Sequence, residues 1–254
     1  MHELASLFLP GADIAVVNGM PRDLSEWPGI FPGASADVVL ARRGEMSTPG
    51  AYAALVAARN PPGVTETLAR ATVGIAGCGG LGSHAALALA RLGVGKLVLA
   101  DFDVVEPTNL NRQAFFAGDI GEKKAPALAR QIGRVNPVVR TEAHDLRLDP
   151  DNIPGVFREC GILLECLDAA EAKQMLVETA LDRLPEVTVV AVSGLAGLGD
   201  GNAVRTRKAA SRLWLVGDGE SAIEDGIGLA APRVLVAAGQ QALCAARVLL
   251  GMRD

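Results

Sequence analysis

The amino-acid sequence predicts an α/β protein with a doubly wound, mainly parallel sheet and an antiparallel extension. From residue 71 onward, short apolar runs alternate with stretches of helical apolar period, an order typical of βαβ units. A glycine-rich turn joins the first apolar run to the first helical stretch. Half of the residues are hydrophobic but only 4% are aromatic, so we expect the aliphatic core of buried parallel strands. Together these observations predict a Rossmann-like body.

The elements of this body follow in chain order. The expected strands are 73–76, 97–100, 138–141, 162–165 and 187–192. The expected helices between them are 83–93, 122–135 and 169–183. An antiparallel pair is expected within 202–216 and a strongly apolar closing helix at 232–250. We assign residues 48–254 to this domain.

The first 47 residues have a different character. Residues 13–19 have the pattern of a strand that runs into a turn, and residues 37–44 that of a second strand ending at a glycine. We therefore expect a small β-rich segment at 1–47, distinct from the body.

The glycine-rich turn carries the first functional signal. Its four glycines are Gly77, Gly79, Gly80 and Gly82. Glycines allow positive φ and close approach of the backbone to a phosphate, and the helix that follows adds its N-terminal partial positive charge. The spacing matches G-x-G-x-x-G, and Asp101 lies about twenty residues further on, where a ribose-binding acid belongs. These features alone favour an NAD-dependent dehydrogenase.

The polar segment at 101–113 argues for a different chemistry. Its donors and acceptors are Asp101, Asp103, Asn109, Arg112 and Gln113. They follow the carboxyl end of a strand, where doubly wound sheets have their ligand crevice. Hydride transfer has no use for so many polar groups. With a lysine at 123 or 124, Arg112 and Asn109 are suited to hold a triphosphate and to offset charge on a leaving pyrophosphate.

Four motifs in order carry a resemblance to a known family. They are G-C-G-G-L-G at 77–82, L-A-D-F-D-V-V-E-P-T-N-L-N-R-Q at 99–113, I-G-E-K-K at 120–124 and E-C-L-D-A at 165–169. In these motifs the chain resembles the ThiF, MoeB and HesA family, bacterial relatives of ubiquitin-activating enzymes. The resemblance implies an ATP-dependent adenylyltransferase that acts on the C-terminal glycine carboxylate of a ubiquitin-like sulfur carrier and releases pyrophosphate.

The resemblance also implies roles for individual residues. Gly80 and its neighbours approach the phosphates, and Asp101 accepts hydrogen bonds from the ribose hydroxyls. Asn109, Arg112 and Lys124 bind the triphosphate. The implied catalytic residues are Arg112, Lys124, Asp168 and Arg59, and the implied ATP-binding residues are Gly77, Gly79, Gly80, Gly82, Asp101, Asp103, Asn109, Arg112, Gln113 and Lys124. Asp168 would ligate Mg²⁺. Arg59 would reach the triphosphate of a neighbouring subunit, which implies a homodimer.

Several residues have a structural alternative. Asp101 can cap the turn after its strand, and Asp168 can be the N-cap of the helix that follows. Lys123 and Lys124 can be a solvated helix start. Cys78 can serve packing alone. The alternative functions are an NAD-dependent oxidoreductase and a non-catalytic, carrier-binding member of the same family.

The N-terminal segment has a resemblance of its own. Val16–Pro21, Ser25–Trp27 and Val38–Gly44 resemble the later half of ThiS, the β-grasp sulfur carrier of thiamine biosynthesis. This implies a partial β-grasp-like segment without the terminal Gly-Gly of a working carrier. Among family members the chain looks most like short, zinc-free ThiF forms, which implies thiamine biosynthesis and a ThiS-like partner.

Composition excludes several other functions and partners. The formal charge of −5 without a basic block argues against nucleic acid. No apolar run is long enough to span a bilayer and no signal peptide is recognisable, so we expect a cytoplasmic protein without a membrane partner. Four scattered cysteines form no C-x-x-C pair, so we expect no zinc. Residues 193–232 contain no cysteine, which argues against covalent sulfur transfer on this chain.

Overall fold

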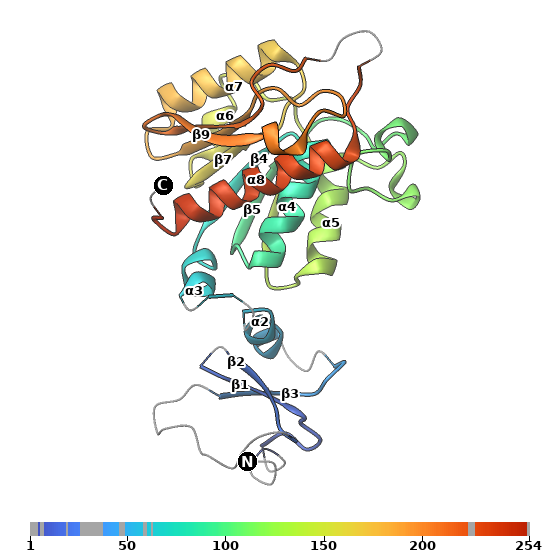
Figure 1. Cartoon of the computed structure of the whole chain (residues 1–254), viewed down its shortest axis with the longest axis vertical. Helices are drawn as coiled ribbons and strands as arrows, with labels where there is room; N and C mark the ends of the chain where they lie inside the picture. Colours follow the sequence, from blue (N-terminus) through green and yellow to red (C-terminus); the bar gives the residue numbers. More distant parts are fainter. Residues whose placement is uncertain are drawn as a thin grey trace. The chain divides into compact units, whose positions relative to one another are not determined.

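The computed structural model describes Ala5 and residues 8–18, 20–25, 38–45, 49–57, 60–61, 63–222 and 227–252. The chain divides into two compact units, Met1–Glu66 and Thr67–Asp254, and Figure 1 labels many of their elements. The sequence-based domain boundary after residue 47 stays a prediction.

The first unit contains a three-stranded antiparallel sheet in the order β2-β1-β3. The strands are β1 (Ile14–Val17), β2 (Met20–Asp23) and β3 (Val38–Ala41). Val17 lies opposite Met20, and Asn18 between them has a φ of 49°, as a two-residue hairpin turn requires. A small cluster of buried residues supports the sheet, formed by Ala5, Ala12, Ala15 and Leu24.

The β-rich character of the N-terminal segment is thereby confirmed, with β1 and β3 where strands were expected. The sequence did not predict β2, because Pro21 within it has no N–H to donate to a ladder. Proline is tolerated in an edge strand, and β2 is at the edge of this sheet. Trp27, part of the ThiS-like pattern, lies outside the described residues.

Two helices that the sequence did not predict follow β3. They are α2 (Pro49–Ala57) and α3 (Val64–Leu68). The α2 sequence is apolar on nearly every side, so it lacks the alternation of apolar and polar faces by which a helix is recognised. α3 spans five residues, too few for such a period to be visible.

The second unit is built on a seven-stranded sheet in the order β6-β5-β4-β7-β8-β10-β9. Its strands are β4 (Thr72–Ala76), β5 (Lys96–Ala100), β6 (Arg140–His144), β7 (Ile162–Glu165), β8 (Thr188–Val192), β9 (Arg205–Ala210) and β10 (Leu213–Gly217). Neighbouring strands are parallel except for β9, which is antiparallel to β10. The predicted fold class, a mainly parallel sheet with an antiparallel extension, is confirmed.

Helices cover both faces of this sheet. They are α4 (Gly80–Leu92), α5 (Lys124–Val135), α6 (Ile153–Phe157), α7 (Ala170–Arg183) and α8 (Ala231–Leu249). α4, α5 and α8 lie on one face, and α6 and α7 on the other (Figure 1). The order of the strands reverses between β4 and β7, so the carboxyl ends of these strands form the crevice at which such folds bind ligands.

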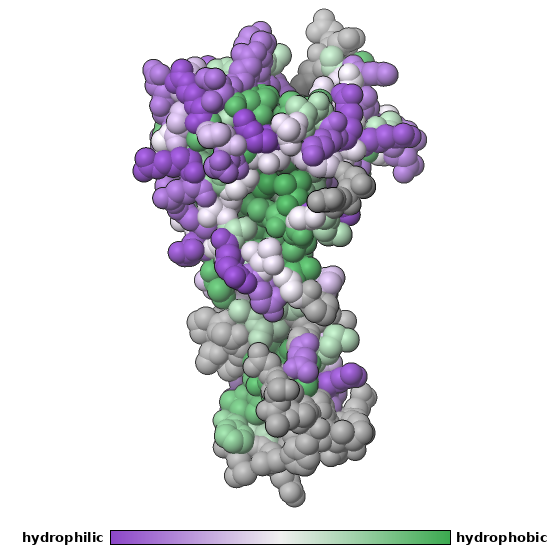
Figure 2. Space-filling model, turned by 90° about the vertical axis from the view of Figure 1, so that its left-hand side faces the viewer, coloured by the Kyte–Doolittle hydropathy of each residue, from purple (hydrophilic) through white to green (hydrophobic). Residues whose placement is uncertain are grey.

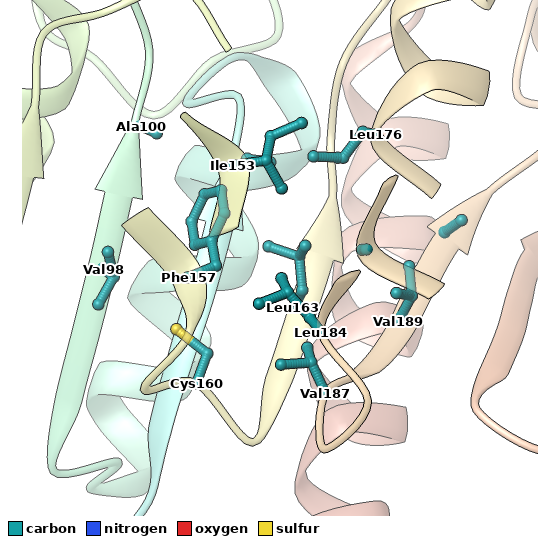
Figure 3. Packing of buried hydrophobic residues seen from close by; sticks show 13 residues of the cluster. Val98, Ala100, Ile153, Phe157, Cys160, Leu163, Leu176, Leu184, Val187 and Val189 are labelled. Carbon is teal, nitrogen blue, oxygen red and sulfur yellow. The ribbon is translucent and has the colours of Figure 1, made fainter. Parts of the chain in front are cut away.

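The core beneath α6 and α7 shows why β4 carries a glycine at its centre. Phe157 points into the space between Val98 of β5 and Leu163 of β7 (Figure 3). A Cβ atom on Gly74 of β4 would lie 2.6 Å from Phe157 Cδ1. The absent side chain of Gly74 therefore leaves the room that the phenyl ring fills.

One strand boundary differs from its prediction. The strand expected at 138–141 is β6, Arg140–His144. Asn136 holds the two valines that follow it in a turn, because its carbonyl accepts from the Val139 N–H at 3.2 Å and its side chain from the Val138 N–H at 3.2 Å. The sequence-based prediction assigned these two valines to the strand, but the turn holds them out of it, so β6 begins two residues later than predicted.

The surface of the second unit is mixed. Figure 2 shows a face on which hydrophilic side chains surround a smaller apolar area. Among the described residues, no helix combines the length and the apolar character needed to cross a bilayer.

Candidate active site

A cavity of about 710 Å³ opens at the carboxyl ends of the central strands. The predicted site residues that line it are Gly77, Gly79, Gly80, Asp101, Asp103, Asn109, Arg112, Gln113, Lys124 and Asp168. Gly82, in the first turn of α4, is not part of the lining. Arg59 lies outside the described residues. The structure thus gathers in one cavity residues that are up to about ninety positions apart in the chain.

The glycine loop connects β4 to α4 by close backbone contacts. Gly77 has a φ of 92°, and a Cβ there would lie 2.7 Å from the carbonyl oxygen of Cys166. A Cβ on Gly82 would lie 1.9 Å from the carbonyl oxygen of Gly77. No side chain caps the N-terminus of α4, so this end of the helix offers its N–H groups and its partial positive charge to an anion.

Asp101, the residue after β5, ties the loop to the next strand. Its carboxylate accepts the Cys78 N–H at 2.6 Å and the Asp103 N–H at 2.8 Å. Burial raises the pKa of the Asp101 carboxyl, and these two hydrogen bonds and the charge of Lys124 oppose that shift. Asp101 therefore does cap its turn, and it also lines the cavity.

The structure distinguishes the two neighbouring lysines. Lys123 donates to the carbonyl of Phe102 at 2.9 Å and pairs with Asp145 at 3.1 Å, with 46% of its side chain exposed. Lys124 leaves only 8% of its side chain exposed and pairs with Asp103 at 2.8 Å. Of the two, only Lys124 lines the cavity.

Three polar residues in or just after the short helix η1 (Pro107–Asn109) line one wall, namely Asn109, Arg112 and Gln113. The Asn109 side chain accepts the Glu106 N–H at 3.1 Å. The Arg112 guanidinium donates to the carbonyl of Thr108 at 3.2 Å and to Asn111 Oδ1 at 2.9 Å. Gln113 is 92% buried, and its Oε1 has no hydrogen-bond partner among the described residues.

Asp168 follows β7 and faces the same cavity. It is exposed and forms no hydrogen bond or ion pair with any residue that the structure describes. The alternative that it caps α7 is wrong, because the N-cap is Ala169 and no side chain caps that helix. A free carboxylate is a suitable oxygen ligand for Mg²⁺, which commonly takes one or two carboxylates together with phosphate oxygens and water. Within the described part of the chain, no three acidic, histidine or cysteine side chains gather into a metal site, so nucleotide phosphates would have to supply the other ligands.

The sequence missed two cationic residues of the cavity. Arg147 lies 5.3 Å from the centre of the Phe102 ring, and both line the wall after β5 and β6. Lys173 reaches the cavity from α7 and pairs with the buried Glu165. Lys173 follows neither a glycine loop nor a strand end. Arg147 comes three residues after β6, but no motif there indicates a ligand site, so the fold is what reveals both residues at the cavity.

Cysteine chemistry has little support at this site. All four cysteines are buried, and none of them forms a disulfide bond. Cys166 lines the cavity, but burial raises the pKa of its thiol well above its usual value, and burial likewise raises that of Cys78. A thiol that stays protonated is a poor nucleophile.

A glycine-rich loop at the switch point of a doubly wound sheet, with cations at the same cavity, is typical of nucleotide-binding α/β domains. Comparison with known families narrows this class. The model of the ThiF family matches residues 52–254, and the chain belongs to that family.

Individual relatives agree with the family assignment. The chain is 35% identical over 121 residues to the adenylyltransferase and sulfurtransferase UBA4 of Yarrowia lipolytica, covering 48% of this chain and 30% of UBA4. It is 36% identical over 117 residues to the probable adenylyltransferase/sulfurtransferase MoeZ of Mycobacterium tuberculosis, covering 46% of this chain and 30% of MoeZ. The matched segment therefore spans about a third of either relative.

A solved structure shares the fold. The tRNA N6-threonylcarbamoyladenosine dehydratase TcdA of E. coli, crystallised with ATP, superposes with a TM-score of 0.68 at 23% identity. The match covers 74% of this chain and 89% of TcdA.

Proposed function

We propose that this protein is an ATP-dependent adenylyltransferase that adenylates the C-terminal glycine carboxylate of a ubiquitin-like sulfur carrier. The observation that supports this most is that Arg112, Lys124 and Asp168 line one cavity with the glycine loop. Membership of the ThiF family adds independent support, as does the fold shared with a protein crystallised with ATP.

The chemistry requires charge stabilisation more than proton transfer. A carboxylate oxygen forms a bond to the α-phosphorus of ATP, and the bond from that phosphorus to the bridging oxygen breaks. Pyrophosphate leaves with the electron pair, and an acyl-adenylate remains. The attacking carboxylate is already ionised near neutral pH, so no general base is needed, and no histidine lines the cavity in the part of the chain that the structure describes.

In this reaction the residues of the chain would have different roles. The N–H groups at the start of α4 and the side chain of Arg112 would hold the triphosphate, while Lys124 would offset the charge that develops on the pyrophosphate. Asp101 would accept hydrogen bonds from the ribose. Asp168 would hold Mg²⁺, which supplies Lewis-acid stabilisation of phosphate charge when it is bound.

The carrier proposed is ThiS-like and the pathway thiamine biosynthesis. The ThiS-like pattern of the N-terminal segment supports this choice, together with the antiparallel sheet of the first unit. We further propose a cytoplasmic homodimer in which Arg59 serves the neighbouring subunit. The raised pKa of the Cys166 thiol supports delivery of sulfur by another protein.

ATP–pyrophosphate exchange tests the proposal directly. The protein is incubated with ATP, labelled pyrophosphate, Mg²⁺ and purified carriers in turn, and exchange is expected with a ThiS-like carrier only when Mg²⁺ is present. A carrier that lacks its terminal glycine is the matched control. Exchange with a different carrier would correct the pathway. Binding of carrier without exchange would favour a scaffold, and tight NAD binding without exchange would favour an oxidoreductase.

A further inference from the structure

The buried carboxylate of Glu165 is the centre of a contact set that the proposed reaction does not use directly. Glu165 is the last residue of β7, and none of its surface is exposed. Its carboxylate accepts the Leu167 N–H at 2.8 Å and the Val192 N–H at 3.4 Å. The Lys173 ammonium pairs with both of its oxygens, at 2.8 and 2.9 Å.

Lys173 makes a further contact that links this set to the cavity. It lies near the start of α7 and lines the cavity wall. Its Nζ also donates to the carbonyl of Leu167 at 2.9 Å. Both polar groups of the Leu167 backbone are therefore held, its N–H by Glu165 and its C=O by Lys173. That carbonyl belongs to the peptide bond that joins Leu167 to Asp168.

Asp168 has no such anchor of its own. Its side chain forms no hydrogen bond or ion pair in the described part of the chain, so the position of its carboxylate depends on the backbone that carries it. A metal ligand loses affinity when the groups that orient it are removed. A buried ion pair by itself contributes little to stability, because desolvation of the two charges offsets their attraction. The need to attach α7 to β7 therefore does not by itself explain why the Glu165–Lys173 ion pair is buried.

We propose that Glu165 and Lys173 are a positioning pair that fixes the Leu167–Asp168 peptide and so directs the Asp168 carboxylate towards nucleotide-bound Mg²⁺. This inference rests on the proposed function. Lys173 is a positioning residue here because it acts through the backbone, whereas Arg112 and Lys124 would contact the nucleotide.

Binding of Mn²⁺, observed by electron paramagnetic resonance, tests the pair without turnover. The full-length protein is saturated with α,β-methylene ATP, from which pyrophosphate cannot leave, and titrated with Mn²⁺. Lys173→Met is expected to weaken Mn²⁺ binding about tenfold or more, approaching the effect of Asp168→Asn. Lys173→Arg keeps a cation and its donors and is expected to stay close to wild type. Binding of the analogue without metal is measured in parallel.

Lys96 provides the matched control. It is a partly buried lysine like Lys173, with 20% and 25% of their side chains exposed, and it pairs with Glu142 and Glu159. It lies at the opposite end of the sheet, outside the cavity. Lys96→Met is expected to leave Mn²⁺ binding unchanged. If Lys173→Met fails to fold, the double variant Glu165→Gln with Lys173→Met leaves no unpaired buried charge and carries the same expectation.

Three results would overturn the inference while wild type binds Mn²⁺ with the analogue. The first is that folded Lys173→Met binds Mn²⁺ as tightly as wild type does. The second is that Lys96→Met weakens Mn²⁺ binding as much as Lys173→Met does. Alternatively, Lys173→Met weakens the metal-free analogue as strongly as the metal complex, which would make Lys173 a phosphate ligand. Failure of wild type to bind Mn²⁺ with the analogue would instead count against the proposed function itself.

Discussion

Replacing Gly82 by alanine tests whether the glycine loop is as tightly closed as the structure indicates. The added Cβ would lie 1.9 Å from the carbonyl oxygen of Gly77, and Cβ atoms do not tolerate contacts under 3.0 Å. Both partners are backbone, so relief requires a shift of more than 1 Å in the loop or in α4. Overpacking of this kind costs about 1–3 kcal/mol. For a domain of this size, about 2 kcal/mol lowers the melting temperature by about 4–8 °C.

Gly133→Ala is the matched control for that measurement. Gly133 lies in α5, and nothing lies within 4 Å of a Cβ built there. Alanine is a better helix former than glycine, so this change is expected to stabilise by about 0.5–1 kcal/mol. Thermal unfolding followed by circular dichroism compares the two variants with wild type. An ATP titration then measures whether each change in sequence alters ATP affinity. If Gly82→Ala melts at or above the temperature of wild type, the close contact between Gly77 and Gly82 is refuted.

Three further predictions concern individual side chains. Lys124→Met should lower pyrophosphate exchange by about 10²–10³-fold without unfolding the protein, whereas Lys123→Met should change it little, and equal losses would contradict the distinction between them. Native protein at pH 8 should resist iodoacetamide at Cys160 and Cys166, because burial raises the pKa of Cys160 to about 12 and that of Cys166 well above its usual value, and mass spectrometry before and after denaturation measures this. The pKa of the Asp218 carboxyl is lowered, and the largest cause is the hydrogen bond that it accepts from the Ser221 N–H. The contribution of Asp218 to stability is therefore fully present above about pH 3.9 and is lost as the pH falls through the lowered pKa. Urea unfolding should therefore show a difference between wild type and Asp218→Asn that is larger at pH 7 than at pH 3, and a constant difference would contradict the shift.

The body of the fold was predictable because each of its signals is local. A buried parallel strand needs only four or five consecutive apolar residues, such as Val73–Ala76, and a loop for phosphate needs glycines at fixed spacing. The N-terminal unit, including α2, was harder to predict because its elements lack such local signals. β2 contains a proline that only its edge position allows, and α2 has no polar face to reveal its period.

Candidate site residues were predictable where they belong to a motif. Asp101, Asn109 and Lys124 lie in short segments whose spacing is fixed by the chain, and the structure brings them to the cavity. The choice between Lys123 and Lys124 illustrates the limit of that reasoning. Adjacent residues at a helix start point in different directions, and only the packed structure shows that one is paired at the surface and the other is buried against Asp103.

The structure explains the first acid of the motif E-C-L-D-A through a residue outside the motif. Its sequence indicated a carboxylate at 168 after a strand, but gave no reason for an acid at 165 in an otherwise apolar run. In the structure that acid is fully buried, and its partner Lys173 lies on the next helix. Nothing in the spacing of Glu165 and Lys173 distinguishes them from surface charges, because their meeting depends on how α7 returns over the end of β7. The part of the site that orients the metal ligand is thus a property of the tertiary fold, and the Mn²⁺ titration is where that dependence is measurable.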